Sequence, residues 1–173
     1  IFFKKLINDA LKKISLNIPP IYFSEHHLSH AASAFFVSPF KDAAVLCIDG
    51  VGEWATTSAW QGKDNNLVPL FEINYPHSLG LFYSAFTSFL GFKVNSGEHK
   101  MMGLAPYGKP KYVETILKNL IHFNSDGSFQ LNFDYFDFTS NDTMVTDKFI
   151  KLFNQTPRSQ DQDITIFHKD LAA

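Results

Sequence analysis

The feature of this sequence that most restricts its fold is an unbroken apolar run that ends at an acidic residue and a glycine. Residues 43–48 are all apolar, and Asp49 and Gly50 follow directly. A continuous apolar run of this length, bounded by turn residues, is typical of a strand that is buried on both faces in the middle of a sheet. We therefore expect a central strand that delivers the Asp49 side chain into a cleft.

Two further apolar runs, at residues 55–61 and 67–73, follow the first and are separated by a polar turn at 62–66. Together the three runs predict an antiparallel meander. Short strands are expected at 21–23 and at 129–133, the second after a hairpin turn at Asp126-Gly127. Apolar residues at helical spacing predict helices over residues 2–14, 26–37, 79–90, 98–104, 112–122, 144–153 and 163–173. Strands beside helices place the chain in the α/β or α+β class.

Some of these predicted helices carry candidate caps. Ser24 and Glu25 precede the helix at 26–37, and Ser78 precedes the helix at 79–90. A hydroxyl or carboxylate at this position accepts a hydrogen bond from the first turn of the helix. For Ser78, capping is the whole role that the sequence predicts.

Composition excludes several classes of protein. The 173 residues, 45% of them hydrophobic, suffice for one domain with a core. The balance of 15 basic and 17 acidic residues provides no basic patch for a nucleic-acid partner. No apolar run approaches the roughly 20 residues of a membrane helix. We do not expect the opening residues 1–5 to belong to a signal peptide, because no small-residue cleavage site follows a hydrophobic stretch. The single cysteine, Cys47, cannot form an intrachain disulfide. We expect a soluble cytoplasmic protein. Because both ends interrupt helical patterns, we also expect an internal fragment.

A pair of histidines has the spacing of metal ligands. His26 and His30 are four residues apart on a predicted helix, so both imidazoles project from one face. They could reach one metal ion, with Asp49 as a third ligand and open positions left for substrate. Two histidines and a carboxylate suit iron and zinc alike. The alternative is that the pair arises by chance and only caps or hydrogen-bonds its neighbours. The residues between the histidines lack the glutamate of the zinc-protease motif, which disfavours a protease.

Glycines follow the apolar run. In the segment Asp49–Glu53, Gly50 and Gly52 would let the backbone turn tightly and approach a ligand, and their amides could cradle a phosphate or stabilise charge on oxygen. The alternative is a plain hairpin turn.

A second segment, residues 95–108, combines three glycines with charged and aromatic side chains. Loops of such mixed composition are commonly binding loops. We predict Gly97 and Lys100 as cofactor contacts, and His99 as a candidate to accept a proton from a substrate hydroxyl. His27 is the other candidate for that role, although it points about 100° away from His26 on a helix and could simply pack or cap. A surface loop of chance polarity is the alternative for residues 95–108.

Four blocks of the sequence resemble the signature of the NodU/CmcH-type O-carbamoyltransferases, in that family's order and spacing. The blocks are His26–Phe40, Asp49–Trp54, Tyr75–Tyr83 and Gly97–Gly108. The resemblance is dense from about Phe23 to Tyr112 and thins from Val113 onward. It is more specific than any one of the motifs alone.

The resemblance implies that residues 1–173 are an internal fragment of an actin-like/RNase H-like ATPase domain, an α/β fold with a mixed sheet and flanking helices. It implies a divalent metal at His26, His30 and Asp49 that contacts carbamoyl adenylate. A second, YrdC-like domain of the same chain, not recognisable here, would make this intermediate from carbamoyl phosphate and ATP. The carbamoyl group would then pass to a hydroxyl of a sugar, antibiotic or similar small molecule. The fragment alone is expected to be inactive.

Two alternatives stay open at the level of sequence. One is a tRNA threonylcarbamoyl transferase of the same superfamily, against which the Asp49–Trp54 block and the weak basicity argue. The other is a metal- or nucleotide-binding domain without catalytic activity, against which the intact histidine pair argues.

Overall fold

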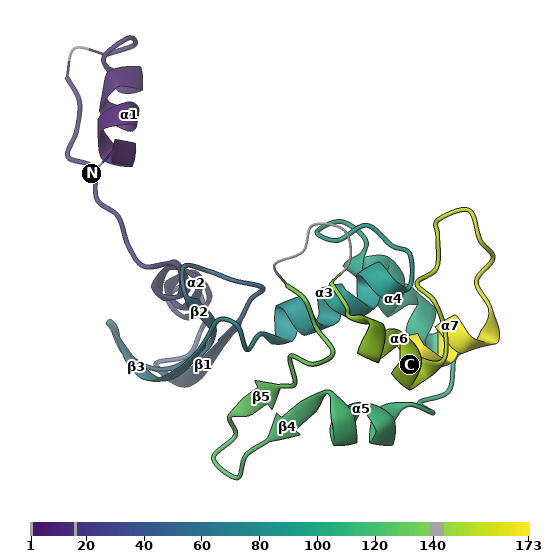
Figure 1. The fold of residues 1–173 in the computed structure, drawn as a ribbon. Helices are drawn as coiled ribbons and strands as arrows, with labels where there is room; N and C mark the ends of the chain where they lie inside the picture. The colour runs from purple at the N-terminus through teal and green to yellow at the C-terminus, as the bar shows by residue number, and fades with distance from the viewer. Residues whose placement is uncertain (1, 16, 139–143) are drawn as a thin grey trace.

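Three strands form the predicted antiparallel meander. In the computed structural model, which describes residues 2–15, 17–138 and 144–173, the sheet has the order β1-β2-β3 (Figure 1). The strands are β1 (Asp42–Ile48), β2 (Ala55–Lys63) and β3 (Asn66–Asn74). Leu46 of β1 pairs with Ala59 of β2, and Ala59 pairs in turn with Phe71 of β3. Two register irregularities in β2, between Ala55 and Thr57 and between Ala59 and Trp60, interrupt its pairing with β3.

The expectation that residues 43–48 form a central strand is wrong for the described structure. β1 lies at an edge of the meander, and its side chains alternate between a covered and an open face. Leu46 and Ile48 are 61% and 52% exposed, whereas Cys47 between them is buried. An apolar run shows that both faces of a strand tolerate burial, but it cannot show what covers each face.

One face of the sheet is covered by α2 (His26–Phe35), which confirms the helix predicted at this position. Ala31 of α2 is fully buried against Cys47 of β1 and Trp60 of β2. Near the C-terminal end of the helix, a Cβ atom at Gly62 would lie 2.6 Å from the ring of Phe35. The glycine therefore lets the helix lie close to β2. Glu25 is the N-cap residue, but its side chain makes no capping hydrogen bond, contrary to the sequence prediction.

The rest of the chain is mainly helical and holds the larger core. Its helices are α3 (Leu79–Phe89), α4 (Glu98–Leu104), the 3₁₀ turn η1 (Ala105–Tyr107), α5 (Val113–Asn119), α6 (Asp147–Phe153) and α7 (Ile166–Ala172). The core is rich in phenylalanine, with Phe89 and Phe149 almost completely buried at its centre. A two-stranded antiparallel hairpin, β4 (Ile121–Phe123) with β5 (Phe129–Leu131), packs beside α5. It replaces the last residues of the helix predicted over 112–122.

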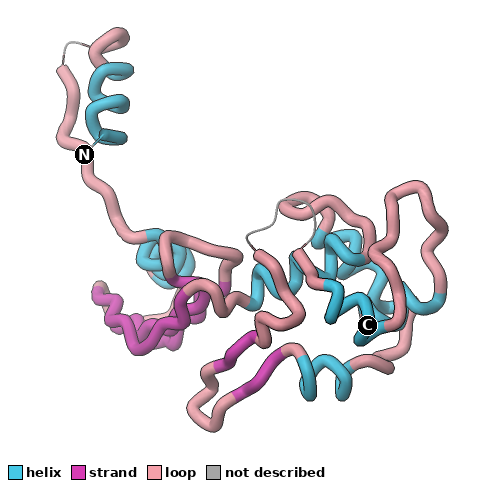
Figure 2. The backbone as a smooth tube through the Cα atoms, in the orientation of Figure 1, coloured by secondary structure: helices cyan, strands magenta, loops and turns pink. Residues whose placement is uncertain are grey.

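At the N-terminus, α1 (Phe2–Leu11) has no buried residue. Figure 1 shows it apart from the sheet, and Figure 2 shows the long loop that joins it to α2. Within this loop Phe23 contacts Phe3, with ring centroids 6.3 Å apart. The strand predicted at residues 21–23 is not formed, because these residues pair with no other strand in the described structure.

The molecule is thus a mixed α/β structure with helices flanking small sheets, which confirms the predicted class. All strand pairs among the described residues are antiparallel, so the parallel pairing of a mixed sheet does not occur within them. None of the described helices has the length and apolar character needed to cross a membrane.

Candidate metal centre

The three predicted metal ligands converge at one point. His26 and His30 come from the first two turns of α2, and Asp49 follows the last residue of β1. The Nε2 atom of His26 lies 2.7 Å from Oδ2 of Asp49 and 2.9 Å from Nε2 of His30. The Nε2 atom of His30 lies 3.8 Å from the same Asp49 oxygen. The sheet and the helix that covers it therefore bring together residues that are 23 positions apart in sequence.

One nitrogen has two close neighbours in this arrangement. Nε2 of His26 cannot donate to Asp49 and accept from His30 at the same time, because a neutral imidazole nitrogen carries either a proton or a lone pair, so hydrogen bonds alone would leave one proton shared between two partners. A cation among the three atoms would remove the conflict. Ligand atoms bound to one metal at 2.0–2.2 Å are roughly 3.0–3.4 Å apart, and the observed separations bracket this range. The side chains are 42%, 55% and 32% exposed, which leaves room for a further ligand. The three residues fit a divalent metal with open positions.

The surroundings of Asp49 keep its carboxyl group ionised, which favours a cationic ligand. Burial raises the pKa of the carboxyl group, but this effect is outweighed by hydrogen bonds and by the nearby histidines. The Gly50 N–H donates to Oδ1 at 2.6 Å, and His26 contacts Oδ2. The net result is a pKa below the ordinary value, so Asp49 is a carboxylate at neutral pH, the form that binds a metal.

The loop that carries Asp49 is held by the start of α3. The predicted N-cap is confirmed, because the Ser78 hydroxyl oxygen accepts a hydrogen bond from the Leu81 N–H at 3.0 Å. The same hydroxyl donates to the Gly50 carbonyl at 2.6 Å, which is more than the sequence predicted for it. In the first turn of α3, a Cβ atom at Gly80 would lie only 2.5 Å from the Asp49 carbonyl oxygen. The absence of a side chain at Gly80 therefore permits this close packing.

The amides of the two glycines in the loop are already hydrogen-bonded within the protein. The Gly50 N–H donates to the Asp49 side chain, and the Gly52 N–H donates to the Ala55 carbonyl at 3.1 Å. A Cβ atom at Gly52 would lie 2.8 Å from the ring of His26. As the alternative interpretation held, the segment forms the turn of a hairpin, and Gly52 lets that turn contact α2.

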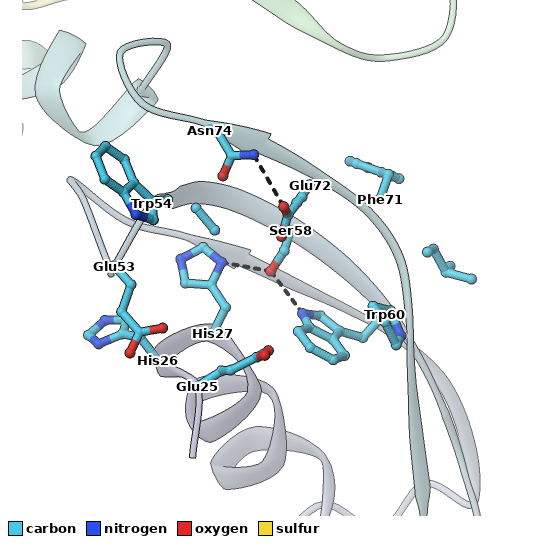
Figure 3. A pocket seen from close by; sticks show the side chains of 13 residues that line it. Glu25, His26, His27, Glu53, Trp54, Ser58, Trp60, Phe71, Glu72 and Asn74 are labelled. Atoms are coloured by element: carbon cyan, nitrogen blue, oxygen red, sulfur yellow. Dashed lines mark hydrogen bonds between the residues drawn. The ribbon is translucent and has the colours of Figure 1, made fainter. Parts of the chain in front are cut away.

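A pocket of about 500 Å³ opens beside His26, between α2 and strands β2 and β3 (Figure 3). Its lining includes three carboxylates and several aromatic rings that the sequence did not identify as site residues. They are Glu25, Glu53, Trp54, Trp60, Phe71 and Glu72. Glu53 had a signal, because it closes the Asp49–Glu53 segment, and Glu25 directly precedes the histidine pair.

His27 lies on the wall of this pocket and is only 5% exposed. Its Nδ1 atom lies 2.7 Å from the hydroxyl of Ser58. Burial lowers the pKa of His27 below its ordinary value; the charge of Asp49 opposes this effect, and His26 and His30 add to it. His27 is therefore neutral at physiological pH.

The other predicted contacts lie elsewhere. Gly97 and Lys100 line a separate pocket of about 380 Å³ with Lys93 and Arg158. Helix α4, which begins directly after Gly97, lies beyond α3 from the sheet in Figure 1. His99 is exposed on α4 and is not among the residues that line the pocket beside His26. The structure does not bring these three residues to the histidine cluster.

Glu98 has a structural role within residues 95–108. Its carboxylate accepts hydrogen bonds from the N–H groups of Asn95 and Gly97 and from the Ser84 hydroxyl of α3. Burial raises the pKa of Glu98, but these hydrogen bonds outweigh burial and hold it below the ordinary value. Its position therefore fixes the turn against α3.

Comparison with known proteins identifies the family. The family model of the carbamoyltransferase N-terminus matches residues 1–173, which is the whole chain. The chain belongs to the carbamoyltransferase family. The resemblance seen in the four sequence blocks is thereby confirmed at the level of the family.

Relatives in this carbamoyltransferase family are longer than the chain. An uncharacterised protein of Synechocystis is 54% identical over 177 residues, which cover 100% of this chain and 29% of that protein. Nodulation protein NolNO of Sinorhizobium fredii is 36% identical over 114 residues, 66% of this chain and 17% of that protein. Nodulation protein NolO of Bradyrhizobium diazoefficiens is 33% identical over 109 residues, 63% of this chain and 20% of that protein. The chain thus spans less than a third of the length of each of these relatives.

Proposed function

We propose that the complete protein that carries this chain transfers a carbamoyl group from carbamoyl adenylate to a hydroxyl of a small-molecule acceptor. The observation that carries this proposal is the convergence of His26, His30 and Asp49 beside a pocket, in a chain of the carbamoyltransferase family. Carbamoyl phosphate and ATP are the source of the adenylate, which a second domain of the same protein makes.

The three ligands would hold a divalent ion, iron or zinc. When bound, such an ion neutralises phosphate charge and acts as a Lewis acid toward a carbonyl oxygen. In the transfer, the acceptor oxygen bonds to the carbamoyl carbon while the bond from that carbon to the adenylate oxygen breaks. AMP leaves, and the hydroxyl proton passes to a base. Of the two histidines considered as that base, His27 and His99, only His27 lines the pocket.

The charge of the pocket supports a small acceptor over tRNA. Glu25, Glu53 and Glu72 line it, and nucleic-acid binding depends on basic side chains that neutralise phosphates. Carboxylates suit an acceptor that brings hydroxyl or amino groups, which can donate hydrogen bonds to them.

The test uses the complete protein and measures two separable reactions. ATP and labelled carbamoyl phosphate are supplied with a panel of sugars and amino sugars, and both pyrophosphate release and labelled product are followed. We expect the double variant His26→Ala/His30→Ala to lose the bound metal and the transfer to the acceptor, while it still releases pyrophosphate. His122→Ala, at an exposed histidine of β4, is the matched control and should retain both reactions. Full transfer by the double variant would refute the proposal.

A further inference from the structure

A line of three buried side chains leads from the sheet to the pocket. The Trp60 indole N–H donates to the Ser58 hydroxyl oxygen at 2.8 Å, and this oxygen lies 2.7 Å from Nδ1 of His27 (Figure 3). The three side chains belong to residues at most 6% exposed. Water therefore does not compete for these hydrogen bonds, and their directions are set within the protein.

The surroundings of Ser58 favour one tautomer of His27. An indole N–H can only donate, so the Ser58 oxygen acts as the acceptor toward Trp60 and keeps its own proton to donate. Two acceptors lie near that proton, Nδ1 of His27 and the Cys47 sulfur. The imidazole lone pair is the better acceptor, because sulfur accepts hydrogen bonds only weakly. This ranking of the two acceptors assigns the acceptor role to Nδ1 of His27 and a ring proton to Nε2.

The Nε2–H group that results has no hydrogen-bond partner among the described residues. Nε2 of His27 is fully buried and unpaired. In Figure 3 the nitrogen that is not bonded to Ser58 faces the part of the lining that contains Glu53 and Trp54. Buried donors in folded proteins are nearly always paired, so an unpaired one in a pocket wall is a candidate to bind a ligand atom.

We propose that the Nε2–H group of His27 donates a hydrogen bond to an oxygen of the acceptor, and that this pocket holds a hydroxyl-rich ring. This inference rests on the proposed function and assigns the acceptor to the pocket. The volume of about 500 Å³ is within the range of small-molecule sites. Carboxylates accept hydrogen bonds from ring hydroxyls, and aromatic side chains pack against the C–H faces of a ring. Both kinds of side chain line this pocket: Glu25, Glu53, Glu72, Trp54 and Phe71. His27 is then a substrate-binding donor and not the base of the reaction.

Two substitutions of His27 in the complete protein distinguish a donor from a base. The side-chain amide of His27→Gln reaches the position of Nε2 and keeps an N–H there, whereas that of His27→Asn reaches only the position of Nδ1. We expect His27→Asn to raise the KM for the acceptor about tenfold, the effect of one lost hydrogen bond. His27→Gln should stay within about threefold of wild type, and kcat should be nearly unchanged in both. An equal loss of kcat in both variants would identify a base. An unchanged KM in both would mean that Nε2–H serves a buried water. Either result overturns the proposal.

A second readout does not depend on activity. Nitrogen-15 NMR of the histidine-labelled complete protein shows directly which ring nitrogen carries the proton. We expect Nε2 of His27 to be protonated and its resonance to move when d-glucose, d-mannose and d-galactose are added together at high concentration. A proton on Nδ1, or no movement with these sugars, overturns the proposal even if the protein transfers no carbamoyl group. Loss of carbamoyl transfer in the His26→Ala/His30→Ala variant, with transfer retained in the His27 variants, would support the proposed function independently of this inference.

Discussion

Replacement of Gly80 by alanine tests whether the packing of α3 against the Asp49 loop sets the geometry of the candidate metal centre. A Cβ atom at this position would lie 2.5 Å from both the Asp49 carbonyl oxygen and the Gly50 nitrogen, where ordinary contacts begin at 3.4 Å. Both neighbours are backbone atoms, so no side chain can rotate away. The loop and α3 must therefore separate by about 0.9 Å.

The size of this displacement decides the expected result. Metal–ligand distances tolerate only about 0.2 Å of variation, so even a third of the displacement at Asp49 would distort the site. We expect Gly80→Ala to weaken metal binding 10- to 100-fold, as changes next to metal ligands commonly do. Overpacking should also lower the free energy of unfolding by about 1–3 kcal/mol. The two effects are separable, because affinity is measured on the folded protein.

The assay is a competition titration of the metal-stripped complete protein with Zn²⁺ and a chromophoric chelator, with urea unfolding of the same preparation. Gly103→Ala is the matched control, since Gly103 lies within α4 and a Cβ atom there would meet nothing within 4 Å. It should bind metal as the wild type does and gain about 0.5–1 kcal/mol from the better helix residue. Wild-type affinity in a folded but destabilised Gly80→Ala protein would refute the reasoning, because the strain would then relax without moving Asp49.

Three further outcomes follow from single side chains. Ser78→Ala removes both the cap of α3 and the bond to the Gly50 carbonyl, so urea unfolding should show a loss of about 1–2 kcal/mol and the Zn²⁺ titration a weaker affinity. Hydrogen bonds from Lys111 and the Lys109 N–H hold the pKa of Asp170 below its ordinary value. The stability that the Asp170 carboxylate adds to the folded protein is therefore present above the unfolded pKa of about 3.9 and is lost as the pH falls through the lower folded pKa. Asp170→Asn should flatten the acid side of a plot of unfolding midpoint against pH. Phe149→Ala empties the centre of the phenylalanine core and should lower the free energy of unfolding by about 3–5 kcal/mol, whereas Phe123→Ala, at an exposed ring, should have little effect.

Elements with local signals at their ends could be predicted from the sequence. Ser78 marks the start of α3 because a serine there satisfies the first turn of the helix, and the structure shows this bond. The meander was predictable because three apolar runs with short polar turns have few other ways to pair. The helix predicted over 112–122 was too long for a nonlocal reason. Ile121 pairs with Leu131, and no pattern within the helix segment shows that partner.

The candidate metal ligands could be predicted because each carries a local signal, although only the packing of α2 on the sheet brings Asp49 to the histidine pair. His26 and His30 share one helix face, and Asp49 marks the end of a strand. The pocket beside His26 could not be predicted, because its carboxylates come from three separate segments. Only the packing of α2 on the sheet brings these segments together. Gly97 and Lys100 were predicted as cofactor contacts from the mixed composition of residues 95–108 and from the resemblance of the Gly97–Gly108 block. They lie elsewhere because Glu98 ties their turn to α3.

The arrangement of α2 connects the candidate metal centre with the candidate acceptor pocket. His26 and His30 face the Asp49 loop, while His27, one residue further along the helix than His26, is turned toward β2. Even so, the ring centroid of His27 lies 6.0 Å from that of His26 and 6.3 Å from that of His30. A molecule of the size of one sugar ring spans such a distance. An acceptor held by His27, as we propose, would therefore have its neighbouring oxygens within reach of a cation bound at the histidine pair. One turn of helix would then both hold the metal and orient the group that attacks beside it.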